Sequence, residues 1–324
     1  MRAIVCRDWG PPESLSIEAW PTREPEPHEV TVRQAAWGVN FVDLLMVAGG
    51  YQLRPPLPFV PGLEGAGTIA AVGSAVREHA IGDAVMTATR PGAFAEEITL
   101  PADAARPVPS GLTLAEAATF RSGFSTAYHA LVQGGRLQAG ETALIHGAAG
   151  GTGLAAVQVA KRLGARVIAM ASDADKFPVL LAHGADHAIA YRDGRFRDEV
   201  KACNDGEGVD VIFDPVGGDV FDESMRCLNW GARLVVVGFA GGRAAHARTN
   251  HVLIKGASVV GIRAGEFARR NPEAGRANMR TLLDWVGAGD IKPHISHRFR
   301  FDNFLDALNV IVERKVIGRV VLER

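Results

Sequence analysis

The fold of this chain is decided by the stretch Leu144-Ile-His-Gly-Ala-Ala-Gly-Gly-Thr-Gly153, in which a short apolar run ends in a glycine-rich turn. We predict a buried strand before the turn and a helix after it. Gly150 leaves room for backbone N–H groups near a phosphate, Gly153 lets the helix pack closely on the strand, and the helix N-terminus adds partial positive charge. The turn therefore indicates a pyrophosphate site. Because Ala148 occupies the first glycine position, a structural turn in another α/β domain is the alternative.

Strands and helices are expected to alternate from residue 141 onward. The predicted strands lie at 142–146, 166–171, 187–191, 209–213, 232–237 and 258–262. The predicted helices lie at 151–164, 173–183, about 195–203 and 219–228. Six strands separated by helices require a doubly wound parallel sheet of the Rossmann type, and such a sheet binds ligands at the carboxyl ends of its strands. We therefore expect an α/β fold.

The first 122 residues have a different pattern, with many Pro and Gly residues and short alternating runs such as Glu29-Val-Thr-Val-Arg33. Short strands between turns predict a β-rich domain. A helix is expected over 113–132, with Thr113 and Glu116 forming a capping box. The sheet already has six strands, so the tail is expected to return to the first domain. We expect a β-rich domain at 1–122 and 264–324, and a dinucleotide-binding domain at 123–263.

Composition limits the possible partners. The chain has 324 residues, 47% of them hydrophobic and 22% charged, which is typical of a folded globular protein. The net charge of −1 gives no electrostatic reason to expect a nucleic-acid or membrane partner. The three cysteines are far apart, which favours a reducing cytoplasm over a disulfide framework.

The second predicted strand ends at Ala171-Ser172, and this end distinguishes the two nicotinamide dinucleotides. NAD sites usually place an Asp or Glu here to bind the ribose hydroxyls, and a carboxylate would repel the 2′-phosphate of NADP. Ser172 therefore favours NADP(H), and Lys176 lies one helical turn farther on, within reach of the phosphate. Asp173 is expected to cap the next helix. If Asp173 turned toward the ribose instead, NAD(H) would be favoured.

The chain resembles the zinc-free quinone oxidoreductase (zeta-crystallin-like) branch of the medium-chain dehydrogenase/reductase superfamily over nearly its whole length. The segments that carry the resemblance are Gly38-Val-Asn-Phe-Val-Asp43, Gly49-Gly-Tyr51, Phe59-Val-Pro-Gly-Leu-Glu-Gly-Ala-Gly67, Thr126-Ala-Tyr-His-Ala-Leu131 and Ala148-Ala-Gly-Gly-Thr-Gly153. Thr152 stands where the branch usually has Val. The resemblance implies that the β-rich domain is a GroES-like catalytic domain. It also implies a homodimer, which we expect to form through the edge strand at 258–262.

The resemblance also implies which residues hold the cofactor. Lys176, Tyr191 and Arg314 fall at positions that bind the 2′-phosphate. The other expected contacts come from the turn and from the ends of sheet strands: Ala149, Gly150, Gly151, Thr152, Gly153, Ser172, Gly238, Phe239, Ala240, Ile262 and Arg263. For Arg263 and Arg314, a position on the solvent-exposed surface is the alternative.

No catalytic zinc is expected. Relatives that oxidise alcohols hold zinc through a Cys after Gly-Val and a His in a Gly-His-Glu triplet, where this chain has Asn40 and Leu63. An amide and an isobutyl group do not replace a thiolate and an imidazole around zinc. We place Asn40, Tyr51 and Thr126 at the reacting end. Asn40 would bind the substrate oxygen or the cofactor ribose, Thr126 would bind the carboxamide of the cofactor, and Tyr51 would line the pocket and donate its hydroxyl. Each of the three could instead have a structural role.

These observations predict NADPH-dependent, metal-free reduction of a quinone, an acceptor that disperses the incoming negative charge over its own π-system. Reduction of an activated C=C bond in an enone, a 2-alkenal or an enoyl thioester is the first alternative. A dinucleotide-binding protein of low turnover with a regulatory or RNA-binding role is the second. The lack of a basic and aromatic stripe argues against RNA.

Overall fold

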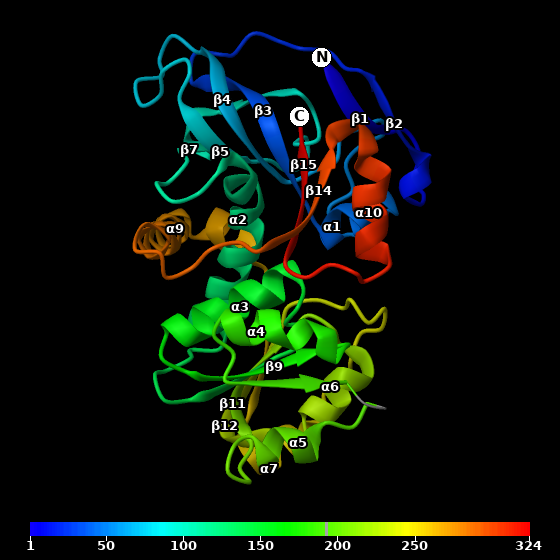
Figure 1. Ribbon diagram of the computed structural model, residues 1–324, viewed down its shortest axis with the longest axis vertical. Helices are drawn as coiled ribbons and strands as arrows, with labels where there is room; N and C mark the ends of the chain where they lie inside the picture. The colour runs from blue at the N-terminus through cyan, green and yellow to red at the C-terminus, as the bar shows by residue number, and fades with distance from the viewer. Residues whose placement is uncertain (192–193) are drawn as a thin grey trace. The chain divides into compact units, whose positions relative to one another are not determined.

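The computed structural model describes residues 1–191 and 194–324, and the chain divides into two units. Unit 1 comprises Met1–Ser122 together with Lys292–Arg324, and unit 2 comprises Gly123–Ile291. The two segments of unit 1 are drawn in blue to cyan and in orange to red in Figure 1. Among the helices that the structure describes, none combines the length and the hydropathy needed to span a bilayer.

Unit 2 contains the predicted six-stranded parallel sheet, in the order β10-β9-β8-β11-β12-β13. Its strands are β8 (Thr142–Ile145), β9 (Arg166–Ala171), β10 (His187–Ala190), β11 (Val209–Asp214), β12 (Leu228–Val236) and β13 (Ser258–Gly261). All four residues of β8 are buried, as expected for a parallel strand covered on both faces. The doubly wound order confirms the α/β prediction.

Helices α3 (Gly151–Arg162), α4 (Phe177–Ala182), α5 (Arg197–Ala202), α6 (Gly218–Ser224) and α7 (Thr249–Lys255) pack around this sheet. Two further helices of unit 2, α8 (Ala264–Arg270) and α9 (Pro272–Gly287), follow β13. One hydrophobic cluster joins Phe196, Phe221 and Val252 of the α5–α7 region to the strands. The helix predicted at 173–183 is shorter than expected, because a 3₁₀ turn (Ala174–Lys176) precedes α4. Helices α7 and α8 were not predicted.

Helix α2 (Leu114–Tyr128) runs from unit 1 into unit 2. It begins with the predicted capping box, in which Thr113 N–H donates to Glu116 Oε2 at 2.8 Å and Glu116 N–H donates to Thr113 Oγ1 at 3.3 Å. It continues into a π-helical segment (His129–Gly134). That segment contacts α8 through His129 and α9 through Gln133, which bonds Asn278 at 3.1 Å.

The second domain boundary lies at 291/292, not at 263/264 as we predicted. Helices α8 and α9 stay with unit 2 because they pack on the end of α2 and on the π-helical segment. His129 stacks on Phe267 of α8 with ring centroids 4.2 Å apart, and Tyr128 packs on Trp285 of α9 at 5.5 Å. Such aromatic contacts between helices produce no local sequence pattern, so the sequence did not reveal that the domain boundary follows α9.

Unit 1 is β-rich. Its strands are β1 (Arg2–Cys6), β2 (Leu15–Ala19), β3 (Glu29–Val39), β4 (Glu64–Val72), β5 (Ala84–Ala88), β6 (Glu97–Pro101), β7 (Ala105–Pro107), β14 (Ile295–Arg300) and β15 (Arg319–Glu323). Short 3₁₀ turns lie at Pro12–Ser14, Ala102–Ala104 and Phe301–Asn303, and the helices are α1 (Phe41–Val47), which was not predicted, and α10 (Phe304–Val312). The larger sheet has the order β14-β15-β3-β4-β5-β7, with β6 also paired to β3.

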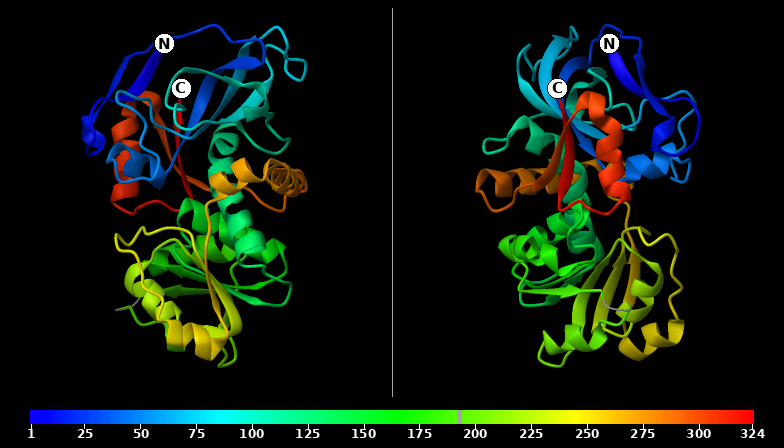
Figure 2. Two further views of the ribbon diagram at one scale, coloured as in Figure 1. Left: turned by 180° about the vertical axis from the view of Figure 1, so that it is seen from behind. Right: turned by 45° about the vertical axis from the view of Figure 1, so that its right-hand side comes forward.

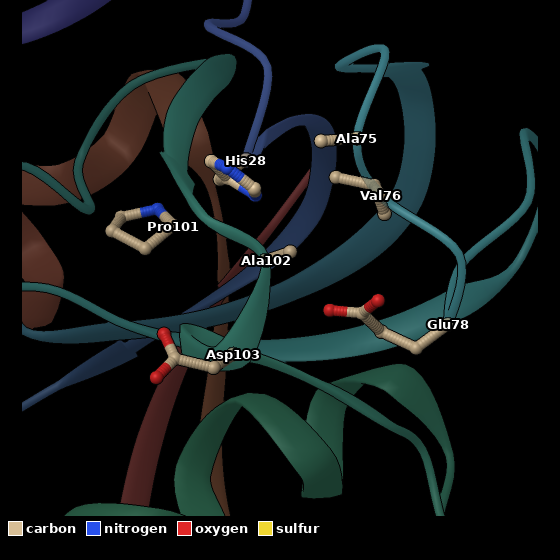
Figure 3. Close-up of a pocket in the computed structure, with 7 residues that line it drawn as sticks. All are labelled: His28, Ala75, Val76, Glu78, Pro101, Ala102 and Asp103. Atoms are coloured by element: carbon tan, nitrogen blue, oxygen red, sulfur yellow. The ribbon is translucent and has the colours of Figure 1, made fainter.

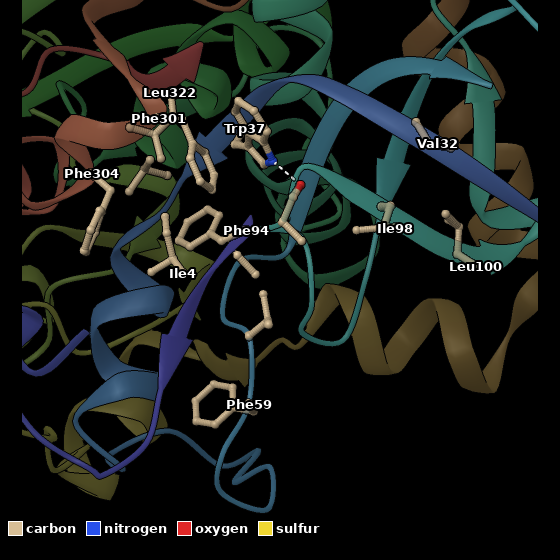
Figure 4. Close-up of a cluster of buried hydrophobic side chains, with 14 of the residues drawn as sticks. Ile4, Val32, Trp37, Phe59, Phe94, Ile98, Leu100, Phe301, Phe304 and Leu322 are labelled. Atoms are coloured by element: carbon tan, nitrogen blue, oxygen red, sulfur yellow. Dashed lines mark hydrogen bonds between the residues drawn. The ribbon is translucent and has the colours of Figure 1, made fainter. Parts of the chain in front are cut away.

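The tail returns to unit 1 as a paired strand. β15 pairs with β3 in antiparallel register, and both views of Figure 2 show it beside β14. The core of this unit is built around Trp37, which is fully buried and donates its indole N–H to the Ala95 carbonyl at 2.9 Å (Figure 4). Its ring packs 4.5 Å from that of Phe301, so the first and last segments of the chain share one core.

Candidate functional site

The glycine-rich turn joins β8 to α3 in the way that close packing requires. Gly147 has a left-handed φ of +56°, and its carbonyl accepts the Gly150 N–H at 2.9 Å. A Cβ added to Gly153 would lie 2.1 Å from the Gly147 carbonyl oxygen, so only glycine fits there. Gly150 is exposed at the N-cap of α3, whose first N–H groups, as in any helix, have no intrahelical acceptor. The turn therefore offers backbone donors to an anion.

The parallel sheet brings most of the predicted cofactor residues of unit 2 to one edge, because they follow the carboxyl ends of strands. Ser172 follows β9, Tyr191 follows β10, and Ile262 follows β13, where its N–H donates to the Val236 carbonyl at 3.1 Å. The loop after β12 contains Gly238, Phe239 and Ala240; Phe239 is half exposed, and Ala240 N–H donates to the Pro215 carbonyl at 2.9 Å. We call the turn (147–153), Ser172, Lys176 and Tyr191 the sheet-edge site.

Ser172, Asp173 and Lys176 form one hydrogen-bonded group after β9. Lys176 Nζ donates to Ser172 Oγ at 2.7 Å, and Ser172 Oγ donates to Asp173 Oδ2 at 2.6 Å. Lys176 Nζ also lies 3.4 Å from Asp173 Oδ2. The Ser172 hydroxyl first, and Lys176 second, lower the pKa of Asp173. The cation that we predicted for the 2′-phosphate thus lies at the end of β9, beside a carboxylate.

Asp173 does not cap the following helix through its side chain, so that prediction is wrong. It occupies the N-cap position with an extended φ of −137°, but its side chain makes no capping hydrogen bond. The carboxylate turns instead toward the Ser172 hydroxyl and the Lys176 ammonium, which offer a stronger, charge-assisted contact than a backbone N–H.

Tyr191 contacts the turn through a chain of hydrogen bonds. Gly147 N–H donates to the Tyr191 hydroxyl at 3.0 Å, and that hydroxyl lies 3.1 Å from His146 Nδ1. His146 Nε2 lies 2.7 Å from Ser224 Oγ, which donates to the Val220 carbonyl at 2.6 Å. Burial lowers the pKa of His146 to about 3 and raises the pKa of Tyr191. Sequence analysis did not assign His146 or Ser224 to the site; a histidine at the end of a buried strand was the only signal.

Asp214 is a further residue that the sequence did not reveal. It ends β11, and its Oδ1 accepts the N–H groups of Val216 at 2.8 Å and Gly217 at 2.9 Å. The side chain is fully buried, and burial raises its pKa. It fixes the loop that lies against the turn, since Pro215 would contact a Cβ on Gly147 at 3.3 Å.

In unit 1, Asn40 lies in a second group of polar side chains. Its Nδ2 donates to Glu64 Oε1 at 3.1 Å and to the Gly38 carbonyl at 3.3 Å. Glu64 also pairs with the guanidinium of Arg319, and its Oε2 accepts the Ser122 N–H at 2.8 Å. Asn40 N–H donates to Asp43 Oδ2 at 2.8 Å. We call Asn40, Asp43, Glu64 and Arg319 the buried polar cluster.

Burial dominates the electrostatics of this cluster. Asp43 is fully buried, and its pKa is raised to about 7 by desolvation and, to a smaller extent, by Glu64, although the Asn40 N–H opposes this. Asp43 Oδ1 has no hydrogen-bond partner among the described residues. Arg319 and Glu64 have side chains only 7% and 1% exposed, so neither charge is solvated by bulk water.

The buried polar cluster does not fit a zinc ion. Zinc sites in proteins are built from thiolate, imidazole and carboxylate ligands, and Asn40 and Leu63 supply neither the thiolate nor the imidazole that zinc-dependent relatives have at these two positions. Both oxygens of Glu64 already accept hydrogen bonds or pair with Arg319. Across residues 1–191 and 194–324, no group of three or more His, Cys, Asp or Glu side chains is arranged to hold a metal.

The remaining predicted residues lie in different units. Tyr51 follows α1 and packs half-buried against the core of unit 1, and Arg314 follows α10 with a left-handed φ of +57°. Thr126 lies half-buried in the unit 2 part of α2, and Arg263 is the N-cap residue of α8. The structure therefore groups the turn and the strand-end residues of unit 2 at the sheet edge, places Thr126 on α2, and places Asn40, Tyr51 and Arg314 in unit 1.

A separate hollow in unit 1 does not belong to either group. Figure 3 shows it lined by His28, Ala75, Val76, Glu78, Pro101, Ala102 and Asp103. It lies where β3 begins, whereas Asn40 follows the far end of the same strand. None of the predicted site residues lines it.

Comparison with known proteins agrees with this geometry. The family described as alcohol dehydrogenase GroES-like domain matches residues 26–110, and the family described as zinc-binding dehydrogenase matches residues 151–286. The quinone oxidoreductase-like protein 2 homolog of Nematostella vectensis is 37% identical over 99% of this chain and 88% of its own length.

Two solved structures are similar over the full length of both chains. Escherichia coli quinone oxidoreductase complexed with NADPH is 28% identical with a TM-score of 0.91 and 100% coverage of each chain. A mycobacterial protein complexed with NADPH is 31% identical with a TM-score of 0.92 and the same coverage. The chain therefore belongs to the quinone oxidoreductase branch of the medium-chain dehydrogenase/reductase superfamily.

Proposed function

We propose that this chain is an NADPH-dependent, zinc-free oxidoreductase of the cytoplasm that transfers hydride from the nicotinamide to a quinone. The observation that carries the proposal is the sheet-edge site, where a glycine turn lies at one strand end and Lys176 donates to Ser172 at the next. The turn suits the pyrophosphate that NADPH and NADH share, and Lys176 suits the 2′-phosphate that only NADPH has. The two NADPH complexes of relatives support the same cofactor.

The residues of this chain would bind and orient the reactants. The α3 N-terminus and turn amides would hold the pyrophosphate, while Lys176, Ser172 and Arg314 would hold the 2′-phosphate. Bound NADPH would supply the hydride. Both N–H bonds of the Asn40 amide donate within the protein, to Glu64 and Gly38, which supports a contact of Asn40 with the cofactor ribose over donation to a substrate oxygen. Only its amide oxygen can meet a ligand, which favours a hydroxyl donor such as the cofactor ribose.

The acceptor is expected to disperse charge by itself. Hydride addition to a simple ketone creates an alkoxide that needs a Lewis acid or a strong donor. Asn40 offers no donor, and the buried polar cluster lacks the ligand set for zinc. A quinone spreads the charge over a hydroquinone anion, so binding and orientation of the two rings suffice. Tyr51 and Thr126 are proposed to line that acceptor site. Enones, 2-alkenals and enoyl thioesters share the same property and form the second candidate class.

The test is a panel of steady-state rates with NADPH against quinones, enones and enoyl thioesters, with metal content measured on the same preparation. We expect turnover with at least one quinone, no stoichiometric zinc, and no loss of rate after a chelator. Turnover confined to enones or thioesters would assign the second candidate class. Bound zinc whose removal abolishes turnover would refute the metal-free chemistry, and tight, salt-sensitive RNA binding with negligible rates would favour a regulatory role.

We also propose a homodimer through β13, which is an edge strand of the unit 2 sheet. Trp230, Leu253 and Ile254 are 78%, 79% and 66% exposed. The Trp230 ring lies beside Gly256, within 3.3 Å of a Cβ placed there, so this apolar surface is near the start of β13. The outer edge of this strand, together with exposed apolar side chains, favours pairing with a second copy. Sedimentation of Val260→Lys should then show a monomer where the unchanged chain sediments as a dimer.

A further inference from the structure

Arg106 of unit 1 has a buried guanidinium nitrogen, Nε, for which the described residues provide no acceptor. Arg106 is the middle residue of β7, and it pairs across from Met86 of β5, which is fully buried. Opposite residues of an antiparallel pair project from the same face of the sheet, so the Arg106 side chain lies on a covered face. A buried polar group without a partner is rare in native proteins, and a site for a bound ion is one physical reason for it.

Arg121 of α2 brings a second guanidinium to the same place. Its Nη1 donates to the Ala104 carbonyl at 3.3 Å, two residues before Arg106 in the chain. Burial first, and the charge of Arg106 second, lower the pKa of Arg121 to about 10. A guanidinium has several N–H donors, and in this pair only Arg121 Nη1 has an acceptor within the part of the chain that the structure describes. Two like charges therefore lie close together with most of their donors unused.

The nearby carboxylates do not neutralise this pair. Glu64 and Asp103 act against the lowering of the Arg121 pKa, yet among residues 1–191 and 194–324 neither forms an ion pair with Arg106 or Arg121. Glu64 already pairs with the guanidinium of Arg319. Asp103 is exposed and lines the hollow shown in Figure 3. Asp103 alone is left to balance two guanidiniums.

We propose that Arg106 and Arg121 form a binding site for an oxyanion, which is a phosphate or a carboxylate. Both side chains are half-buried, so part of each remains accessible to a small ligand. Guanidiniums bind such groups through parallel N–H···O bonds, and an oxyanion between the two would also relieve their repulsion. The same chemistry fits a free anion, such as inorganic phosphate, and an acidic group carried by the acceptor.

The experiment titrates the full-length chain with inorganic phosphate in a calorimeter, at constant ionic strength. We expect the dissociation constant to rise about tenfold or more in both Arg106→Met and Arg121→Met, as the loss of a charge-assisted contact implies. Arg300→Met is the matched control, because it removes the same charge from an exposed residue at the end of β14 and should bind phosphate as before. Phosphate that binds at the sheet-edge site contributes equally to all of these variants.

Thermal unfolding without phosphate gives an independent readout. Arg106→Met removes an unsatisfied buried donor and one of two like charges, so it should be at least as stable as the unchanged chain. Phosphate should raise the midpoint of the unchanged chain and of Arg300→Met, and should raise that of Arg106→Met much less. An Arg106→Met chain that is less stable and binds phosphate as before would make Arg106 a structural residue.

Arg106→Lys covers the case in which the methionine variants do not fold. It keeps the positive charge and the stem but loses the planar fork, so phosphate should bind more weakly than to the unchanged chain. Phosphate binding of equal strength would show that the guanidinium of Arg106 does not bind the oxyanion.

Two acceptors distinguish the sources of the oxyanion. The Michaelis constant of a benzoquinone that carries a carboxylate is compared with that of benzoquinone itself. If the oxyanion belongs to the acceptor, Arg121→Met should raise the first constant alone. If the site takes a free anion, both constants stay unchanged while phosphate affinity falls. Equal phosphate affinities together with equal Michaelis constants would overturn the proposal. A chain without turnover would refute the proposed function only, because the phosphate titration requires no activity.

Discussion

The sheet-edge site of unit 2 and the buried polar cluster of unit 1 hold charge in different ways. At the sheet edge, Lys176 pairs with Asp173, whose side chain is 64% exposed, and the other groups of the site are hydroxyls and backbone N–H groups. In the cluster, Glu64 and Arg319 pair at 1% and 7% exposure, beside the fully buried Asp43. A charged side chain at the sheet edge, such as Lys176, can give up its contact with a protein group and bind a ligand instead. Charges in the cluster depend on one another, so a change there should affect the whole unit.

The largest expected effect is that of Arg319→Met, which leaves Glu64 as a buried charge without its cation. Loss of one partner of a buried pair typically costs about 3–5 kcal/mol in the free energy of unfolding. Urea unfolding measures it. Arg298→Met on the neighbouring strand β14 is the matched control, because its pair with Glu323 is 49% and 39% exposed and should contribute at most about 1 kcal/mol. Equal effects of the two variants would contradict the contrast between the regions.

The two regions also differ in how far sequence predicts them. Most of the sheet-edge site is local in sequence: the turn after β8, the small residue at the end of β9, and Lys176. Strands and helices alternate through this region, so a parallel sheet necessarily brings these residues to the same edge. The cluster joins residues 40, 64 and 319, and only the pairing of β15 with β3 and of β3 with β4 brings them together. No local pattern predicts such long-range pairing, and the partner of Glu64 was not foreseen.

At the sheet edge, the sequence predicted where residues lie more accurately than it predicted which hydrogen bonds their side chains make. Tyr191 was correctly placed at the end of the third strand, yet its hydroxyl faces Gly147 and His146. Asp173 was correctly placed before a helix, yet its carboxylate turns to Lys176. A strand end fixes where a residue lies, while the direction of its side chain depends on neighbours from other strands.

The second effect is a pH dependence of stability that arises from Asp43 in the buried polar cluster. The pKa of Asp43 is raised from 3.8 to about 7 in the folded chain, mainly by burial, so the folded state binds its proton more tightly than the unfolded state. The stability from this group is complete below pH 4 and is lost as the pH rises through about 7, by an amount on the order of a few kcal/mol.

Unfolding of Asp43→Asn across this pH range isolates the effect, because an asparagine stays neutral and can still accept the Asn40 N–H. The unchanged chain should lose stability relative to the variant between about pH 4 and pH 8. A difference that is constant with pH would show that Asp43 keeps an ordinary pKa, and the cluster would then be less isolated from water than we infer.

The third effect tests the backbone of the sheet edge. Gly153→Ala puts a methyl group 2.1 Å from the Gly147 carbonyl oxygen, so α3 or the turn must shift. We expect a loss of about 1–3 kcal/mol in unfolding free energy, typical of overpacking, and weaker binding of NADPH and NADH alike. Gly150→Ala is the control, since its methyl group lies 3.3 Å from the same oxygen and its φ of −77° suits alanine. That variant should cost less stability.

The smallest effect separates the two cofactors through the one ammonium group of the sheet-edge site. Lys176→Met keeps the apolar stem of a side chain that is 9% exposed but removes the charge offered to a 2′-phosphate. We expect the Michaelis constant for NADPH to rise about 10- to 100-fold, as the loss of a charged contact implies, and that for NADH to stay unchanged. Asp173→Asn should act in the opposite direction, because it removes a carboxylate that competes with the phosphate for Lys176. If both variants leave the preference for NADPH over NADH unchanged, another residue binds the 2′-phosphate. Arg314 of unit 1 is then the next residue to test by substitution.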